Sequence, residues 1–434
     1  MKRYVKKMLS LTLCFGMVTS VLFSCGVQKT EAPAGGESEA AKTEITLWTY
    51  PVGKFGDADT VDSLVAKFNE KYPDIAVSVE YLDYTNGDDQ VNTAIEGGQA
   101  PDIIFEGPER LVANWGAKGL MVDLKDLWTD EAKSSIYASV ESACKSNEGV
   151  YYEYPLCMTA HTMAINKEAF EKADALKYVD VENGTWTTED FENAVKALKA
   201  AGQDQVAAVY CAGQGGDQGT RALVNNLYGG MFTNKEHTEY TVNSEENIKA
   251  LELLKSLDGV KYDASLVGGD EIALFCNGTL PMAFCWNVAQ EKNNAEAIAF
   301  DVIPMAFPSH DGQPELCGGI WGFGIFNNND EARIEASKKF IDFMANDEAQ
   351  AVESVRATTY WPVRDMGNIY EGDELMTEYA KFIEFMGDYY QVVGGWAEAR
   401  TAWWNMLQSI GSGTDVKEAV ATFDKTANDA AAVK

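Results

Sequence analysis

Aromatic rings and carboxylates are the side chains of this sequence with the most evident chemistry. The 434 residues include 10 tryptophans, 19 tyrosines and 67 acidic residues. Aromatic faces can stack on the apolar faces of a ring-shaped ligand, while carboxylates, amides and arginines form directed hydrogen bonds with hydroxyl groups. Signatures such as G-x-S-x-G and H-E-x-x-H are absent from the sequence. These residue types favour binding of a polar solute. A glycosidase stays an alternative, because its catalytic pair of acidic residues could not be recognised among so many carboxylates.

The elements that position these residues follow from hydrophobic periodicity. Residues 45–48 and 75–81 alternate apolar and polar side chains, as strands do, and residues 101–105 read as a short buried strand. Apolar residues at helical spacing fill the two intervals between these strands, and the second helix ends at Gly97-Gly98. This alternation predicts βαβ units with a mainly parallel sheet.

Candidate binding residues lie directly after these three strands. Ligands of open α/β sheets bind beyond the carboxyl ends of the strands, so the stretches 49–56, 83–89 and 106–110 should line a site. Their candidate side chains are Tyr50, Tyr84, Glu106, Glu109 and Arg110. The tyrosines could equally face away from a cleft, and the arginine could simply pair with a neighbouring carboxylate.

Three tryptophans lie in or beside later strand-like segments. Trp286 ends the segment NGTLPMAFCW, Trp321 lies within the glycine-rich segment GGIWGFGIF, and Trp361 follows in a loop. Each ring could line a cleft or pack in a core, because large aromatic side chains are usually well buried.

Trp396 is the preferred ligand contact near the C-terminus. It lies on a predicted helix with Trp403 and Trp404, which point in other directions and can serve packing instead. Arg400 follows Trp396 by four residues and shares its face of the helix. We therefore expect Trp396 and Arg400 to face a ligand together.

The N-terminus has the pattern of a bacterial lipoprotein signal. Four basic residues precede a largely apolar run over residues 8–23, which is too short to anchor as a spanning helix. The run ends in LFSC, which is similar to a lipobox with an unusually bulky phenylalanine. We expect residues 1–24 to be removed and Cys25 to carry a palmitate-type anchor, with an ordinary secretory signal as the alternative. Residues 25–43 lack periodicity and should form a flexible tether, which leaves the protein at the cell membrane, facing outward.

Composition limits the remaining possibilities. The exported chain is too long for one core, so two lobes are expected, and no later segment is apolar enough to span a membrane. The net charge of −32 disfavours nucleic acid and anionic lipid as partners. The eight cysteines form no C-x-x-C pair, and with three histidines they offer no zinc pattern. The sequence leaves open whether disulfides form. Several cysteines lie in apolar runs, where a buried free thiol is favoured.

Several segments also match a known family in their order along the chain. The clearest is GGQAPDIIFEGPER, at residues 97–110, followed by GLMVDL at residues 119–124. Others are FNEKYPDIAVSVEYL, NGTLPMAFCW and WAEARTAWWNML. Together they resemble the extracellular solute-binding proteins of ABC importers, in particular the maltose-binding-protein-like branch that binds carbohydrates.

The resemblance implies a periplasmic-binding-protein-like α/β fold, with two α/β sandwich lobes joined by a multi-strand hinge. It places an N-lobe at residues 44–156 plus 321–364 and a C-lobe at residues 157–320 plus 365–434. The crossover strands would fall near residues 154–158, 318–322 and 363–370. A sugar would be held where the two lobes close.

The resemblance also implies roles for individual residues. Glu109 and Arg110 stand where the family has an acidic residue and an arginine that hydrogen-bond sugar hydroxyls. Trp286 and Trp396 stand where it has tryptophans that stack on pyranose rings. Glu106 replaces a stacking tryptophan of the maltose binder, which argues against maltose itself.

The predicted function is therefore capture of a sugar or oligosaccharide by a membrane-tethered, monomeric lipoprotein that serves the permease subunits of an ABC importer. No catalysis, cofactor, metal or nucleic acid is expected. The alternatives are a binder of the same fold for a polyamine, a peptide or ferric ion, a receptor for a sensor kinase, and a secreted glycosidase. Tyr389 and Tyr390 resemble the tyrosine pair that iron-binding relatives use.

Overall fold

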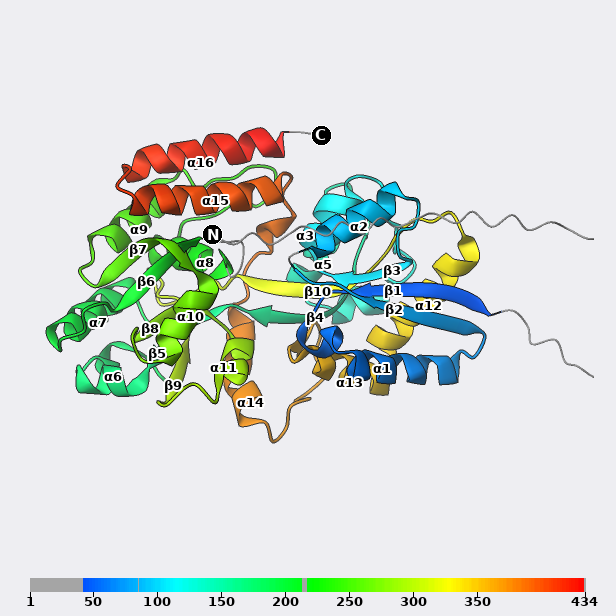
Figure 1. Ribbon diagram of the computed structural model, residues 1–434, viewed down its shortest axis with the longest axis horizontal. Coiled ribbons are helices and arrows are strands. Elements are labelled where there is room, and N and C mark those ends of the chain that lie inside the picture. The colour runs from blue at the N-terminus through cyan, green and yellow to red at the C-terminus, as the bar shows by residue number, and fades with distance from the viewer. Residues whose placement is uncertain (1–41, 85, 213–216, 433–434) are drawn as a thin grey trace, which may run out of the picture. The chain divides into compact units, whose positions relative to one another are not determined.

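The computed structural model describes residues 42–84, 86–212 and 217–432, and these residues form one compact unit. Their strands fall into two groups (Figure 1). A six-stranded sheet builds the part that we call the N-lobe. A three-stranded sheet and a separate two-stranded pair build the part that we call the C-lobe. This mixed architecture confirms the predicted α/β class.

The N-lobe sheet contains the parallel arrangement that the sequence predicts. Its strands, in order across the sheet, are β11 (Trp361–Pro362), β4 (Tyr154–Ala160), β10 (Gly318–Ile325), β3 (Ile103–Glu106), β1 (Thr43–Thr49) and β2 (Ile75–Tyr81). β1 pairs in parallel with both β2 and β3. Helices α1 (Ala58–Lys71) and α2 (Gly87–Glu96) connect these strands, which gives the two predicted βαβ units.

Local sequence explains why these elements form. The buried face of α1 consists of Val61, Leu64, Val65 and Phe68, which have the spacing of one helical stripe. All of β3 is buried, and α3 (Pro108–Arg110) follows it directly, so polar side chains appear where the strand ends. The remaining helices of the N-lobe are α4 (Asp130–Ser135), α5 (Ala138–Ala143), α12 (Glu331–Asn346) and α13 (Glu348–Thr358).

Two antiparallel strands, β4 and β10, connect the lobes (Figure 1). Their register pairs Gly318 with Ala160 and Phe323 with Tyr154. β10 also pairs with β3 of the N-lobe, whereas β4 leads almost directly into β5 (Thr162–Asn166) of the C-lobe. Two of the three predicted crossovers lie in these strands.

The third predicted crossover, near residues 363–370, is not a strand. β11 contributes two residues that pair with β4, and Arg364 then forms only an isolated bridge. Pro362 lacks a backbone N–H and Gly367 has a φ of +66°, so the ladder stops here. The chain returns to the C-lobe through irregular structure that leads to α14 (Glu374–Ala380).

The C-lobe surrounds short sheets with helices. Its three-stranded sheet is antiparallel, in the order β8 (Met282–Trp286), β5 and β9 (Val302–Met305), and its parallel pair is β6 (Ala207–Ala212) with β7 (Val260–Val267). α15 (Trp396–Gly411) packs on β6, on β7 and on α16 (Val416–Ala431). The other helices are α6 (Lys167–Lys172), α7 (Thr188–Ala200), α8 (Asp217–Tyr228), α9 (Glu245–Ser256), α10 (Gly268–Cys276) and α11 (Val288–Asn294).

Hydrophobic packing is divided between the lobes. The largest buried cluster draws on residues 160–317 and 361–427, and the second on residues 45–158 and 320–389. The clusters therefore separate at the C-lobe end of the β4–β10 pair, where Ala160 pairs with Gly318. The predicted lobe boundaries themselves stay predictions, because the described residues form a single compact unit.

The cysteines of the described ranges are buried free thiols, namely Cys144, Cys157, Cys211, Cys276, Cys285 and Cys317. Disulfides, which the sequence left open, are therefore not formed among these six. The predicted signal segment and Cys25 lie outside the described residues.

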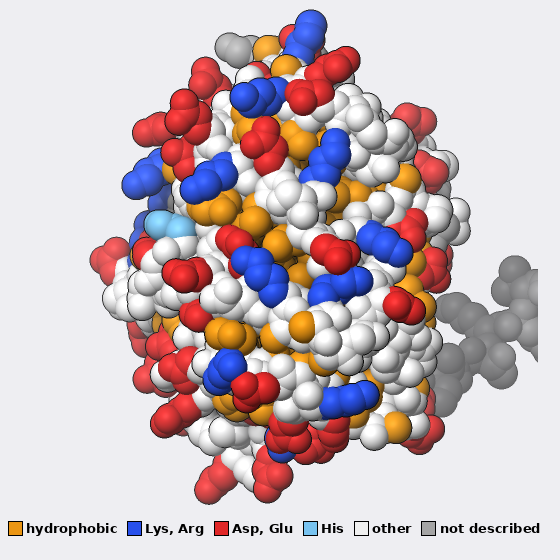
Figure 2. Space-filling view, turned by 90° about the vertical axis from the view of Figure 1, so that its left-hand side faces the viewer, with side chains coloured by type: hydrophobic (Ala, Val, Ile, Leu, Met, Phe, Trp, Pro, Cys, Tyr) orange, Lys and Arg blue, Asp and Glu red, His pale blue; other side chains and the backbone are white. Residues whose placement is uncertain are grey.

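The surface of the described residues is strongly charged. Figure 2 looks onto the C-lobe end, where acidic and basic side chains are interspersed with small hydrophobic stretches. Over the same ranges, no helix combines the length and the apolar character that crossing a membrane requires.

Gly322 lies where β10 and β4 approach each other closely. A Cβ at this position would overlap the carbonyl oxygen of Tyr154 on the paired strand. We expect Gly322→Ala to lower the free energy of unfolding by about 1 to 3 kcal/mol, as overpacking does. Gly269→Ala meets no atom within 4 Å and serves as the control in urea unfolding. Equal stability of the two variants would contradict this account.

Candidate functional site

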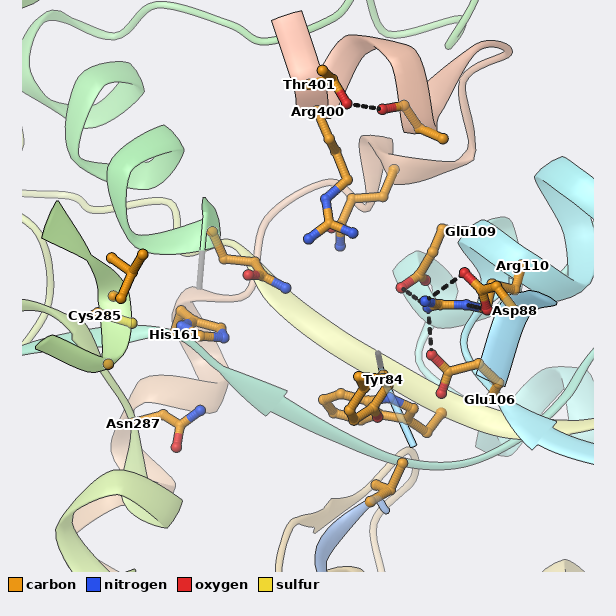
Figure 3. Close-up of a pocket in the computed structure, with 18 of the residues that line it drawn as sticks. Tyr84, Asp88, Glu106, Glu109, Arg110, His161, Cys285, Asn287, Arg400 and Thr401 are labelled. Carbon is orange, nitrogen blue, oxygen red and sulfur yellow. Dashed lines mark hydrogen bonds and ion pairs between the residues drawn. The ribbon is translucent and has the colours of Figure 1, made fainter. Parts of the chain in front are cut away.

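A cavity of about 1150 Å³ is lined by residues of both lobes (Figure 3). Its N-lobe wall comes from the ends of β1 and β3, the loop after β2, and the start of α2. Its C-lobe wall comes from α8, α10, α11 and α15, and β10 crosses between the walls. The volume exceeds the range of about 300 to 1000 Å³ that is usual for small-molecule sites, so a ligand of more than one ring would fit.

Arg110 lies at the centre of the N-lobe wall, among carboxylates (Figure 3). Its Nε and Nη2 donate to the two oxygens of Asp88 at 2.7 and 3.1 Å, and its Nη1 donates to Oε1 of Glu106 at 2.7 Å. Nη1 also lies 3.8 Å from Oε1 of Glu109. Arg110 thus lines the cavity and also pairs with neighbouring carboxylates, which combines the two predicted alternatives. We call Asp88, Glu106, Glu109 and Arg110 the acidic wall.

Glu106 is the most deeply buried carboxyl of the acidic wall. One of its oxygens accepts from Arg110, and the other, Oε2, has no hydrogen-bond partner. Burial raises the pKa of Glu106 to about 8; Arg110 opposes this effect, and the charges of Glu109 and Asp88 add to it. The wall therefore holds more carboxyl groups than its one guanidinium can neutralise, and Glu106 is mainly protonated near pH 7.

A further buried carboxyl, Glu153, lies behind the acidic wall. Both of its oxygens lack hydrogen-bond partners, and burial together with the charges of Glu109 and Glu106 raises its pKa well above the usual value. In front of it, Oε2 of Glu109 accepts a hydrogen bond from the hydroxyl of Tyr389 at 2.6 Å. Tyr389 therefore holds one carboxylate of the wall in place.

Two stacked tyrosines flank the acidic wall. The rings of Tyr50 and Tyr84 lie 5.2 Å apart at an angle of 24°, and the guanidinium of Arg110 lies 5.1 Å from the first and 5.9 Å from the second. Tyr50 is fully buried and donates its hydroxyl proton to Asp88, whereas Tyr84 is 53% exposed and lines the cavity. Of these two predicted residues, Tyr84 can meet a ligand and Tyr50 supports it.

An aromatic pair lies on the crossover between the walls. The rings of Trp321 and Tyr360 stack at 5.0 Å with an angle of 13°, and both line the cavity. A Cβ at Gly319 would overlap the indole of Trp321, so the indole rests on this glycine. The alternating geometry of β10 thus fixes a flat aromatic surface in the cavity.

The C-lobe wall has its own arginine pair. Nη2 and Nε of Arg400 donate to the two oxygens of Asp217 at 2.7 and 3.2 Å. Arg221, which is fully buried, lies 3.1 Å from the same carboxylate. Burial opposes ionisation of Asp217, but the two arginines outweigh it and lower the pKa to about 2. Arg400 lines the cavity, as predicted, and is held there by a buried carboxylate.

Neutral polar groups fill the rest of the C-lobe wall. Asn287 caps α11 by accepting from the backbone N–H groups of Ala289 and Gln290, which leaves its amide N–H groups available. Burial lowers the pKa of His161 to about 4, so its imidazole is neutral near pH 7. Nδ1 of His161 and Oε1 of Gln290 are buried without a hydrogen-bond partner. This wall can exchange hydrogen bonds with a hydroxylated ligand.

Two predicted stacking tryptophans, Trp286 and Trp396, do not line the cavity. Trp286 is fully buried and donates from Nε1 to the hydroxyl of Tyr379 at 2.7 Å. Its neighbour Cys285 lines the cavity instead, because successive side chains of a strand point in opposite directions. Trp396 is buried with its ring 4.6 Å from the guanidinium of Arg221.

The position of Trp396 shows how α15 is turned. Residues 397, 401 and 405 line the cavity, whereas Trp396, Ala399 and Trp403 belong to the buried stripe. Arg400 lies at the border of the two stripes. Trp361 is also buried, packed edge-on against Tyr370 and away from the cavity lining.

Several lining residues were missed by the sequence analysis. Asp88 lies within the stretch that follows β2, and Asn287 directly follows β8, so the rule about strand ends covers both. Tyr360, which directly precedes Trp361 in the chain, also lines the cavity. His161 gave no signal, because nothing in sequence marks the residue between two buried strands.

A family model for bacterial extracellular solute-binding proteins matches residues 54–351. The chain belongs to this family. The match covers most of the chain, including β3 and the crossover strands, so the assignment made from sequence segments is confirmed.

Solved structures of similar proteins share the fold at low identity. The cyclic α-maltosyl-1,6-maltose binding protein of Arthrobacter globiformis is 19% identical, with a TM-score of 0.74 over 90% of this chain and 99% of that one. The ABC substrate-binding protein Lmo0181 of Listeria monocytogenes, in complex with cycloalternan, is 20% identical, with a TM-score of 0.68 over 89% and 98%. UgpB of Mycobacterium tuberculosis, in complex with glycerophosphocholine, is 19% identical, with a TM-score of 0.68 over 89% and 97%. These matches establish the periplasmic-binding-protein-like fold.

One curated relative matches at the level of sequence. An uncharacterized lipoprotein encoded in the oleD 5′ region of Streptomyces antibioticus is 25% identical over 144 residues. The aligned part is 33% of this chain and 31% of that protein, so this chain spans less than a third of the relative's length.

Glu106→Gln should change how stability depends on pH. The pKa of Glu106 is about 8 in the folded protein and about 4.5 when unperturbed, so the folded state binds more protons between these values. The contribution of Glu106 to stability is present below pH 4.5 and is lost as the pH rises through 8. Between about pH 5 and pH 8, the free energy of unfolding of the wild type should fall relative to the variant by more than about 1.4 kcal/mol, the equivalent of one pKa unit.

Urea unfolding at both pH values measures this difference, and Glu141→Gln is the control. A hydrogen bond from Tyr151 lowers the pKa of Glu141, so its titration lies below the window. Parallel pH profiles for the wild type and Glu106→Gln would contradict the assignment.

Proposed function

We propose that this protein captures a saccharide outside the cell membrane and delivers it to the permease subunits of an ABC-type importer. Family membership supports a role in solute binding. One protein of the same fold is named as binding cyclic α-maltosyl-1,6-maltose, and another was solved in complex with cycloalternan. Both ligands are carbohydrates. No group of three or more His, Cys, Asp or Glu side chains in the described ranges is arranged to hold a metal ion.

The observation that carries the proposal is the composition of the cavity. The stacked pair of Trp321 and Tyr360 offers an aromatic face, which suits the CH face of a pyranose ring. Carboxylates and arginines of both walls surround it, together with the neutral side chains of Asn287 and Gln290. A saccharide needs this combination, because its ring faces are apolar while its edges are hydroxyl groups.

Capture requires that the ligand contact both walls. The lobes share the β4–β10 pair, and the cavity lies where this pair passes between them. A saccharide that bonds to Arg400 on one side and to Glu109 on the other would favour a closed arrangement over an open one. The closed form would then dock on the importer, and a lipid on Cys25 would keep the protein at the membrane surface.

The ferric-ion alternative gains no support from the tyrosine pair. The hydroxyl of Tyr389 donates to Glu109 in the N-lobe, whereas that of Tyr390 lies 3.4 Å from Sγ of Cys317 in the C-lobe. Both rings are buried, and neither lines the cavity. The two hydroxyls are thus engaged in separate packing environments.

Trp321→Ala should weaken saccharide binding by at least about tenfold, equivalent to about 1.4 kcal/mol, because it removes half of the stacked aromatic pair. Calorimetric titration with a panel of neutral oligosaccharides, spermidine and ferric citrate measures both the ligand class and the loss. Tyr137→Ala, which removes an exposed ring outside the cavity, is the control. The proposal is wrong if spermidine or iron binds and no saccharide does, or if an oligosaccharide is recovered cleaved.

Cys25→Ser should release the protein from the membrane fraction, since the predicted anchor attaches to this thiol. Metabolic labelling with a fatty-acid analogue, followed by fractionation, tests this in the native host. Cys144→Ser keeps the label, because Cys144 is a buried thiol of the folded part. A labelled, membrane-bound Cys25→Ser protein would show that the anchor lies elsewhere.

A further inference from the structure

The two walls of the cavity differ in their charge balance. In the acidic wall, one guanidinium faces three carboxyl groups, those of Asp88, Glu106 and Glu109. In the C-lobe wall the ratio is reversed, because two guanidiniums share the carboxylate of Asp217. The N-lobe side of the cavity therefore has more carboxyl groups than cations.

The polar atoms left without partners point to a missing donor. Oε2 of Glu106 is buried and unpartnered on a side chain that lines the cavity and is only 1% exposed. Across the cavity, Oε1 of Gln290 is an acceptor without a donor. A cation beside Glu106 would favour its ionised form, in which Oε2 is an acceptor as well. Buried acceptors are costly when they are unpaired, so a ligand that supplies N–H or O–H groups would be stabilised here.

The surroundings of Glu106 add no further cation. The titratable groups that face it are Arg110, Asp88, Glu109, Glu153, Tyr50, Tyr84 and Cys157. Arg110 is the only cation among them, and Asp88 already occupies two of its donor groups. The aromatic faces of Tyr84 and of the stacked Trp321–Tyr360 pair line the same cavity, and such faces attract cations.

We propose that the saccharide taken by this cavity carries a protonated amine, which binds at the acidic wall beside Glu106 and Glu109. This inference rests on the proposed function and narrows its substrate class to amino sugars. The ammonium supplies the missing charge and the missing donors together, while the sugar hydroxyls meet Arg400 and Asn287 on the other wall. An acidic sugar is disfavoured at the acidic wall, because its carboxylate would lie beside Asp88 and Glu109 with Arg110 as the one counter-charge there.

Four hexoses that differ in one substituent test this on the wild-type protein. They are D-glucosamine, D-glucose, N-acetyl-D-glucosamine and D-glucuronate, titrated calorimetrically near pH 6.5, where a primary amine is protonated. We expect D-glucosamine to bind at least about tenfold more tightly than D-glucose or its N-acetyl form, and D-glucuronate to be the weakest. A crystal structure of the complex should place the amine nitrogen within hydrogen-bonding distance of Glu106 or Glu109.

Two variants connect the preference to the acidic wall. Glu106→Gln keeps an oxygen for Arg110 but cannot ionise beside a bound ammonium, so the preference for D-glucosamine over D-glucose should fall to within about threefold. Glu141→Gln, outside the cavity, should keep the full preference. Circular dichroism checks that both variants fold, and if Glu106→Gln does not, the wild-type series decides alone.

The outcomes separate this inference from the proposed function. Equal or tighter binding of D-glucose or N-acetyl-D-glucosamine overturns the amine assignment and leaves saccharide capture intact. The same holds if none of the four hexoses binds up to about 10 mM while a neutral oligosaccharide does. Binding of spermidine in the absence of any saccharide overturns both. A preference for D-glucosamine that persists in folded Glu106→Gln removes the acidic wall as its cause.

Discussion

The antiparallel pairing of β4 with β10 is the constraint on which the rest of the structure depends. Both strands belong to the N-lobe sheet at one end and reach the C-lobe at the other, so one ladder of backbone hydrogen bonds holds the two lobes. Each strand must be apolar enough to be buried and small enough to pack closely, which explains the four glycines of β10. Because Trp321 is carried on this ladder, the aromatic surface of the cavity has a fixed place between the walls.

Each wall of the cavity contains a partly buried arginine. Both use a bidentate carboxylate, Asp88 for Arg110 and Asp217 for Arg400. A planar guanidinium held by two parallel bonds loses its rotational freedom and stays aimed at the cavity. The remaining charges differ between the walls, since Glu106 and Glu109 crowd the first pair and Arg221 supports the second. Carboxyl groups therefore outnumber arginines on the N-lobe side of the cavity, and arginines outnumber carboxylates on the C-lobe side. This difference would orient a ligand whose two ends differ in charge.

Sequence reasoning predicted the fold and the residues of one cavity wall, because both depend on short stretches of sequence. The strands and helices near the N-terminus are set by periodicity within short windows, and ligand positions at strand ends follow from the topology. Glu106, Glu109 and Arg110 therefore line the cavity as expected. Trp286 and Trp396 were misplaced because the orientation of a strand end or a helix depends on its tertiary partners. Tyr379 accepts the indole N–H of the first, and Arg221 stacks on the second.

The buried stripe of α15 shows why a tryptophan-rich helix says little about ligand contact. Trp396 and Trp403 fill the C-lobe core around Phe232, and small or polar residues are left to face the cavity. A large ring gains more from full burial than from a surface that must also remain open to solvent between ligands. The cavity keeps its exposed aromatic surface where packing cannot absorb it, above Gly319 on a strand shared by two lobes. The aromatic side chains that line the cavity are thus those that the core has no space to bury.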